Sequence, residues 1–238
     1  MTFKAKALSL VRRGKREVIL TAIGFNGGNN LFKWKLAYSR TLDKGLISKV
    51  LYFPNQDAWL EMFPGLRKLS ITSDQIRFTD RRATYMGAAQ GVDYTPQERA
   101  RFIKDVLLTS DGFKQSLERA QAFVRDDDLV INVRRGDYYN SRFEPEFGIN
   151  IVEYVRQALA KQLALGPVGR VVLVSDNVPW CVDNLTHLAP QLEFVVNENR
   201  RDMFDDLAVL ACAKRLILAN STFSYWGAFI AQVLGTQL

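Results

Sequence analysis

Short apolar runs in the second half of the chain alternate with amphipathic segments. The runs predict buried strands, at 129–133, 171–174, 194–196 and 215–219. Apolar residues three or four positions apart predict helices between and after them, at 151–165, after Pro179 to about 187, at 202–214 and around 225–227. Strands that alternate with helices form right-handed βαβ crossovers, so the pattern predicts an α/β fold with a parallel sheet.

The first half of the chain has a weaker pattern. Residues 18–22 predict a strand, Gly24 to Asn30 predict a glycine-rich turn, and residues 31–42 predict a helix. This order presents backbone N–H groups to a phosphate or sugar, although a plain tight turn at Gly27 or Gly28 explains the glycines more simply.

The segment between this helix and the second half is harder to interpret. A short strand is predicted at 50–53 and a helical region at 102–124, broken near 110–112, while residues 55–101 have no clear pattern. We therefore expect two halves, residues 1–125 and 126–238.

Polar clusters follow three of the predicted strands in the second half. They are RRGD at 134–137, SDN at 175–177 and NSTFS at 220–224. Since the carboxyl ends of parallel strands meet at one edge of the sheet, where open α/β sheets bind ligands, the three clusters predict a polar ligand pocket. Arg134 and Arg135 need an anionic partner or water there; a solvated strand end with an ion pair to Asp137 is the alternative.

The amino-acid composition limits the classes of partner and cofactor that we expect. The chain of 238 residues has a net charge of +7, but the basic residues are diffuse and form no nucleic-acid-binding motif, so no specific nucleic-acid partner is expected. Cys181 and Cys212 lack paired spacing and are expected to be reduced thiols. With a single histidine, His187, expected on a surface helix, no metal site is predicted.

Neither a membrane span nor a secretory signal is indicated by the sequence. We expect a cytoplasmic protein whose membrane contact is at most peripheral, at the inner face. The oligomeric state is not predicted.

Four segments resemble motifs of the bacterial α-1,2-fucosyltransferases, in the same order. GGNNLFKWKLA is similar to their GNQMFQYAFA opening, INVRRGDYY to HxRRGDY, VSDNVPW to SDDxxW, and LANSTFSYWGAFIA to ANSTFSWWGA. The resemblance implies a GT-B-like α/β architecture with two Rossmann-like halves: an acceptor-side half at 1–125 and a GDP-fucose-binding half at 126–238. It further implies inverting transfer of L-fucose from GDP-fucose to the 2-hydroxyl of a galactose-terminated glycan, without a metal or other cofactor.

The same resemblance implies roles for individual residues. Arg134 clamps the diphosphate, and Asn29 lies near the diphosphate or the fucose. The expected donor-binding residues are Asn132, Arg135, Asp176, Ser221, Thr222, Phe223 and Ser224. The permanent charge of Arg134 and the opening turn of a helix suit the charge that develops on a leaving diphosphate.

The catalytic base is left open by the sequence. We expect Asp137 to be catalytic together with Arg134 and Asn29. Asp137, Glu144 and Glu146 are the candidate bases, and an ion-pair partner or a plain loop carboxylate is the alternative for each. Tyr225 and Trp226 are interpreted as packing residues, and Asp205 and Asp206 as carboxylates that favour a helix start, at least in one case.

The chain departs from the family pattern in places. Asn132 stands where the family has His, and family members continue beyond the last motif, so the donor-binding half is expected to be shortened. The alternative function is therefore a GDP-sugar-binding relative with impaired catalysis.

Overall fold

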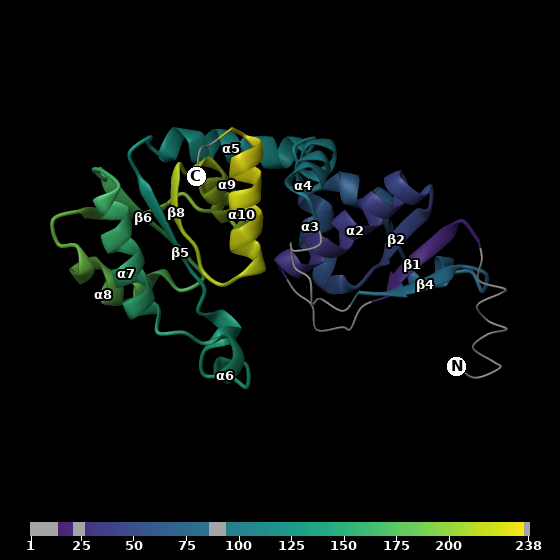
Figure 1. Ribbon diagram of the computed structural model, residues 1–238, viewed down its shortest axis with the longest axis horizontal. Coiled ribbons are helices and arrows are strands. Elements are labelled where there is room, and N and C mark those ends of the chain that lie inside the picture. Colours follow the sequence, from purple (N-terminus) through teal and green to yellow (C-terminus); the bar gives the residue numbers. More distant parts are fainter. Residues whose placement is uncertain (1–13, 21–26, 86–93, 236–238) are drawn as a thin grey trace. The chain divides into compact units, whose positions relative to one another are not determined.

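The structure is a computed structural model that describes residues 14–20, 27–85 and 94–235. It divides into two compact units, Met1–Phe113 and Lys114–Leu238, and the helix α5 (Asp111–Phe123) spans the division. Each unit is described separately below (Figure 1).

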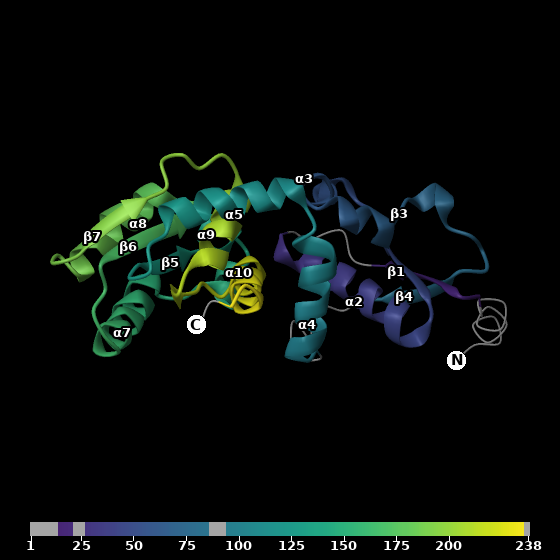
Figure 2. The same cartoon turned by 90° about the horizontal axis from the view of Figure 1, so that it is seen from above.

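The first unit contains a four-stranded sheet in the order β3-β2-β1-β4, and every strand pair is parallel. Figure 2 shows β3, β1 and β4 with α2 beside them. Its elements are β1 Arg16–Leu20, α2 Gly28–Lys44, β2 Ile47–Leu51, the 3-10 helix Pro54–Gln56, α3 Asp57–Met62, the 3-10 helix Pro64–Leu69, β3 Ser70–Ile71, the 3-10 helix Ser73–Gln75, β4 Arg81–Thr84, α4 Pro96–Phe102 and the π-helix Ile103–Leu107.

The second unit also contains a parallel four-stranded sheet, in the order β7-β6-β5-β8. Its strands and helices are β5 Leu129–Val133, the 3-10 helix Gly136–Tyr138, α6 Glu144–Phe147, α7 Ile151–Ala164, β6 Arg170–Ser175, α8 Val178–Leu185, the 3-10 helix Thr186–Leu188, β7 Glu193–Val196, α9 Met203–Cys212, β8 Arg215–Ile217 and α10 Thr222–Val233. These two sheets confirm the predicted α/β class with two Rossmann-like halves.

The strand order of the second sheet defines where a ligand would sit. From β5 the chain proceeds outward through β6 to β7 and then returns to the other side of β5 with β8. The connections therefore change direction between β5 and β8, and ligands of open α/β sheets bind at the carboxyl ends of the strands at such a switch point. The segments that begin there are Arg134 onward and Leu218 onward.

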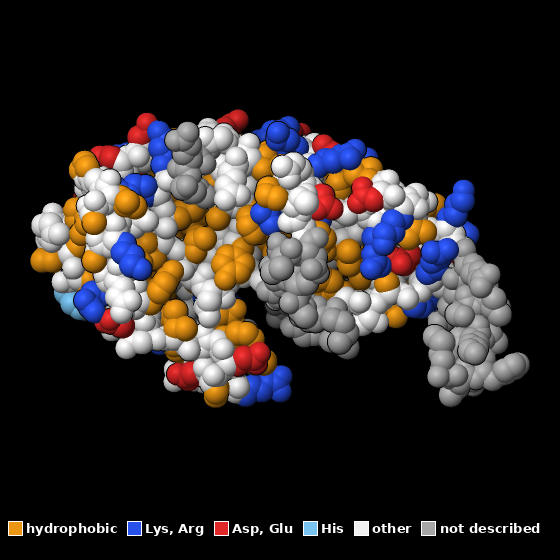
Figure 3. Space-filling view, in the orientation of Figure 1, with side chains coloured by type: hydrophobic (Ala, Val, Ile, Leu, Met, Phe, Trp, Pro, Cys, Tyr) orange, Lys and Arg blue, Asp and Glu red, His pale blue; other side chains and the backbone are white. Residues whose placement is uncertain are grey.

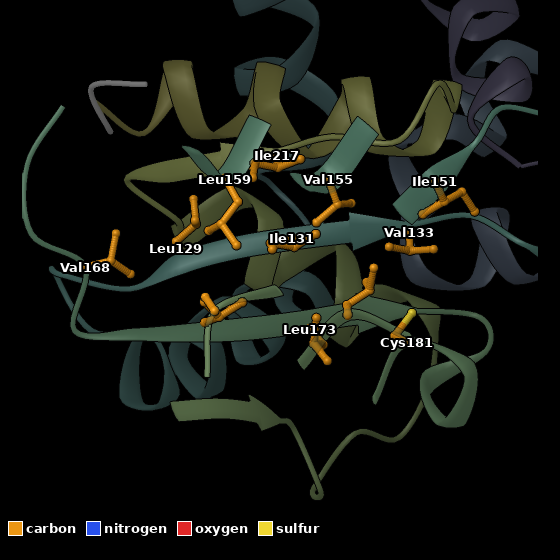
Figure 4. Close-up of a cluster of buried hydrophobic side chains, with 13 residues drawn as sticks. Leu129, Ile131, Val133, Ile151, Val155, Leu159, Val168, Leu173, Cys181 and Ile217 are labelled. Carbon is orange, nitrogen blue, oxygen red and sulfur yellow. The ribbon is translucent and has the colours of Figure 1, made fainter. Parts of the chain in front are cut away.

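Alternate residues of β5 face opposite layers of the second unit. Leu129, Ile131 and Val133 belong to a buried cluster that includes residues of α7 and α8, and Figure 4 shows Val155 and Leu159 beside Ile131. Because side chains alternate along a strand, Asn132 faces the other layer, which contains α9 and α10. That layer is tightly packed, since a Cβ added at Gly227 of α10 would lie 2.5 Å from Cβ of Leu210 in α9.

Several predicted boundaries differ from the observed ones. β1 ends at Leu20, and residues 21–26, which include the end of the predicted strand and the start of the predicted turn, are outside the described residues. Gly27 has φ +55 and precedes α2, so Asn29 and Asn30 lie in the first helical turn rather than in a loop. The predicted strand at 50–53 is β2, which ends two residues earlier, and α6 lies between the predicted strand at 129–133 and the predicted helix at 151–165, where no helix was expected. His187 is exposed in a 3-10 helix and both cysteines are free thiols, as expected.

Two lysines of α2 are buried in the first unit. Burial lowers the pKa of Lys33 and of Lys35 to about 8 each. Nζ of Lys35 lies 3.1 Å from the centroid of the Tyr94 ring and 3.9 Å from Oε1 of Glu98, but desolvation outweighs the attraction of that carboxylate. A charged amine in this position lowers the stability of the folded chain.

Replacing Lys35 with Met is expected to stabilise the chain at pH 7 by about 2 kcal/mol, because the apolar side chain keeps the packing without a buried charge. The pKa of Lys35 is about 8 when folded and 10.5 ordinarily, so the unfolded chain binds the proton more tightly. The free energy of unfolding of the wild type therefore rises between pH 8 and pH 10.5 as the folded chain loses the Lys35 proton. Above that range Lys35→Met is no longer more stable than the wild type.

Urea denaturation of both proteins at pH 7 and pH 10.5 measures this difference. Lys44→Met, at an exposed position in the last turn of α2, is the matched control. If Lys35→Met were more stable than the wild type by the same amount at both pH values, the stability difference would not come from the charge of the Lys35 amine.

Candidate functional site

Arg134 directly follows β5 and is held by a carboxylate at the end of β6. Its Nη1 lies 2.8 Å from Oδ2 of Asp176, and the other oxygen of Asp176 accepts a hydrogen bond from the backbone N–H of Arg135 at 2.9 Å. The side chains are 39% and 27% exposed, so the ion pair is accessible to solvent. A pair of this kind contributes little to stability, but it orients the guanidinium at the sheet edge.

Gly136 allows this pair to pack against the backbone. A Cβ at this position would lie 2.6 Å from Oδ2 of Asp176 and 3.0 Å from Cζ of Arg134. Any larger residue therefore displaces the ion pair. This role of Gly136 was not predicted, and its signal in the sequence is the glycine between charged residues in RRGD.

Asn132 and Ser224 connect β5 with the first turn of α10. The Ser224 hydroxyl donates a hydrogen bond to Oδ1 of Asn132, and Nδ2 of Asn132 donates to the carbonyl of Val174 at 3.0 Å. Both side chains are buried, at 7% and 0% exposure. These bonds place the start of α10 against the carboxyl end of β5 and engage both residues inside the protein; their contact with a nucleotide stays a prediction.

The Arg135 guanidinium lies between two aromatic rings. Cζ is 4.4 Å from the ring centroid of Tyr139 and 4.2 Å from that of Trp180, the third residue of α8. Such stacking favours the planar guanidinium over a lysine amine. Arg135 therefore positions the loop after β5 against α8, and its contact with the donor stays a prediction.

The turn between β8 and α10 is fixed on both sides. Ser221 caps α10, since its hydroxyl accepts from the backbone N–H of Phe223 at 3.3 Å. Asn220 donates to the carbonyl of Phe147 at 2.9 Å, and the Tyr154 hydroxyl donates to the carbonyl of Leu218 at 2.8 Å. Thr222 and Phe223 are half-buried in the first turn of α10, where helix N–H groups favour an anion.

The candidate bases lie in the segment after β5. Asp137 is in the 3-10 helix Gly136–Tyr138, but its side chain is outside the described part of the structure. The Glu144 carboxylate accepts from the backbone N–H of Asn140 at 2.8 Å, while Glu146 is exposed in α6. Figure 3 shows acidic, basic and hydrophobic side chains gathered over α6. No base is singled out by this geometry.

Other predicted residues have clear positions. Asn29 lies in the first turn of α2 in the first unit, whereas the remaining candidates belong to the second unit. Trp226 is fully buried against Phe229, which confirms its packing role, whereas Tyr225 is 37% exposed and its packing role stays a prediction.

Asp205 and Asp206 lie in the first turn of α9, as expected for carboxylates near a helix start. Both are also ion-paired: Asp205 with Arg119 at 2.7 Å, and Asp206 with Arg200 at 2.7 Å. Burial nevertheless raises the pKa of Asp206, since desolvation outweighs the arginine.

Across residues 14–20, 27–85 and 94–235, no group of three or more His, Cys, Asp or Glu side chains is placed to hold a metal ion. Within the same ranges, no helix combines the length and the apolar character needed to cross a membrane.

Residues 95–238 match the protein family described as Glycosyl transferase family 11, which is more than half of the chain and includes every candidate residue of the second unit. The chain belongs to glycosyl transferase family 11. This membership confirms the family resemblance inferred from the motifs, and it covers the Arg134 and Asp176 pair and the start of α10.

Relatives of this family 11 chain share limited identity with it. The O-antigen biosynthesis glycosyltransferase WbnK of Escherichia coli is 27% identical over 101 residues, which cover 42% of this chain and 33% of WbnK. Galactoside alpha-(1,2)-fucosyltransferase 1 of Ateles belzebuth is 25% identical over 142 residues, which cover 58% of this chain and 36% of that protein. The matched part thus spans about a third of the length of these relatives.

The crystal structure of POFUT1 in its apo form is similar to the family 11 chain in fold. The two superpose with a TM-score of 0.51 at 10% sequence identity, over 94% of this chain and 97% of POFUT1. The predicted GT-B-like fold class is thereby confirmed.

Proposed function

We propose that the protein transfers L-fucose from GDP-fucose to the 2-hydroxyl of a galactose-containing glycan. The observation that carries the proposal is the pair of Arg134 and Asp176 at the carboxyl ends of the neighbouring strands β5 and β6, in a chain of glycosyl transferase family 11 whose α10 follows β8, the other neighbour of β5. Relatives named as galactoside fucosyltransferases support the choice of donor and acceptor.

The chemistry follows from the charges at this edge. The acceptor oxygen forms a bond to the anomeric carbon of fucose while the bond from that carbon to the diphosphate oxygen breaks, and GDP leaves with the electron pair. Inversion follows from attack opposite the leaving group. In this proposal Arg134 and the first-turn N–H groups of α10 stabilise the charge on the leaving diphosphate, and a base accepts the proton of the acceptor hydroxyl.

Arg134 is oriented for this role by Asp176, whose other oxygen is held by the Arg135 backbone. The half-exposed ion pair lets the guanidinium bind a diphosphate without leaving Asp176 unsolvated. No metal is needed in the proposal, because a permanent cation and a helix N-terminus supply the positive charge.

Thermal unfolding with nucleotide sugars tests the donor assignment. A ligand that binds only the folded chain raises the unfolding temperature, so GDP-fucose is expected to stabilise it more than GDP-mannose or UDP-galactose. Transfer is measured by mass spectrometry with lactose as acceptor, and the linkage by NMR. Greater stabilisation by UDP-galactose overturns the proposal, while GDP-fucose binding without transfer supports a catalytically impaired relative.

Gly136→Ala is expected to weaken GDP-fucose binding by about tenfold, because the added methyl group displaces the Arg134 and Asp176 pair by steric overlap. Isothermal titration measures the change. Gly112→Ala is the matched control, since its added Cβ would meet its nearest neighbour at 3.4 Å, an ordinary contact. Equal donor affinity in the two variants would show that the pair does not contact the donor.

A further inference from the structure

A cavity of about 600 Å³ lies at the carboxyl ends of β2 and β3 in the first unit. Leu51 and Ile71 are partners in the last register position of these strands, so Tyr52 and Thr72, which follow them, lie side by side. The backbone N–H of Tyr52 donates to the carbonyl of Ile71 at 2.9 Å. The α3 residues Asp57 and Glu61 line the same cavity. Its size falls within the range of ordinary small-molecule sites.

Two charged groups in this cavity have unused hydrogen-bonding capacity. The Glu61 carboxylate is exposed and makes no hydrogen bond or ion pair with another residue in the described ranges. Nε of Arg67 donates to the carbonyl of Leu60 at 3.2 Å, which fixes the guanidinium, and its two terminal nitrogens have no partner among the described residues. The cavity thus offers hydrogen-bond acceptors on Glu61 and donors on a guanidinium that is held in place.

The Tyr52 ring is also oriented. Its hydroxyl donates to Oδ1 of Asp57 at 2.7 Å, and this bond raises the pKa of Tyr52. Ile71 and Leu60, both buried, contribute apolar surface. An aromatic ring and apolar floor beside charged hydrogen-bonding groups suit a sugar, which has an apolar C–H face and hydroxyls that both donate and accept.

The charge of the cavity selects among ligands. Asp57 and Glu61 outnumber Arg67, so the lining carries a local net charge of −1 in a chain of net charge +7. This disfavours a phosphate or a nucleotide, whose charge the two carboxylates repel. A neutral hexose meets no such repulsion, and its hydroxyls can donate to the carboxylates and accept from the guanidinium.

We infer that this cavity binds a neutral sugar residue of the glycan acceptor, with Glu61 and Arg67 as hydrogen-bonding partners of its hydroxyls. The identity of the glycan as acceptor rests on the proposed function. Binding of the sugar itself does not, and it is measured without a donor.

The test compares Glu61→Ala and Arg67→Ala with wild type in a titration with lactose, followed by NMR, in the absence of nucleotide. Each variant is expected to raise the dissociation constant for lactose about tenfold, since each removes a charge-assisted hydrogen bond. Glu118→Ala, at an exposed position of α5, is the matched control and leaves the constant unchanged. The unfolding temperatures of the variants check that the fold is intact.

Acceptor kinetics separate this inference from the proposed function. If GDP-fucose is used and the KM for lactose rises in both variants while the KM for GDP-fucose does not, both hold. Unchanged lactose binding in the variants, or no lactose binding by wild type, overturns the inference even if transfer occurs. Loss of lactose binding in the variants of a chain that does not use GDP-fucose supports the inference and overturns only the proposed function.

Discussion

Arg134→Ala is expected to lower kcat/KM for fucosyl transfer by about 10³-fold, which corresponds to about 4 kcal/mol of transition-state stabilisation. In the proposed mechanism the guanidinium neutralises charge that develops on the leaving diphosphate, so kcat falls more than donor affinity does. Steady-state kinetics with GDP-fucose and lactose measure the effect, and titration with GDP measures the part due to binding.

Two variants make this result specific. Arg134→Lys keeps the charge but not the bidentate geometry and is expected to recover only part of the activity. Arg156→Ala removes an exposed arginine of α7 that pairs with Glu153 at 2.6 Å, and is expected to leave transfer unchanged. Wild-type kcat in Arg134→Ala would rule out the diphosphate clamp.

Asp128→Ala is expected to destabilise the second unit by about 3–5 kcal/mol, since it leaves a buried arginine without its counter-ion. Nε of Arg170 lies 2.8 Å from Oδ1 of Asp128, and the two side chains are only 10% and 0% exposed. Asp128 also accepts from the backbone N–H of Arg125 at 2.8 Å. Urea denaturation at neutral pH measures the loss.

Asp126→Ala provides the comparison for Asp128. Asp126 is two residues away and pairs with Lys214 at 2.7 Å, but its side chain is 87% exposed. An exposed pair contributes about 0–1 kcal/mol, so this variant is expected to unfold near the wild-type urea concentration. Similar losses in both variants would mean that the Arg170 pair is not buried in solution.

The two central strands of the second sheet were predictable because they are buried on both faces. β5 and β6 are entirely buried, and such strands read as continuous apolar runs. The first sheet was predictable only in its strands β1 and β2, since β3 has two residues and β4 has the sequence RRAT, neither of which carries an apolar pattern. Hydrogen bonding to neighbouring strands, rather than side-chain pattern, defines those two elements.

From the sequence, we could predict which segments form the site, but not the side-chain contacts within it. Parallel topology alone brought Arg134 and Asp176 to one edge, so their proximity follows from the strand pattern. The stacking of Arg135 between Tyr139 and Trp180 depends on the path of the loop after β5. Likewise, the bond from Ser224 to Asn132 depends on where α10 begins, and no local sequence signal encodes either distance.

The identical strand order of the two sheets has a consequence for biosynthesis. In the first sheet β1 pairs with β4, which is complete once Thr84 has been synthesised. In the second sheet β5 pairs with β8, which is complete only once Ile217 has been synthesised. Pairing between segments so far apart in sequence is slow, because a long loop must close first. The amino-terminal sheet is therefore expected to assemble on the ribosome before β5 has paired with β8, its second neighbour in the other sheet.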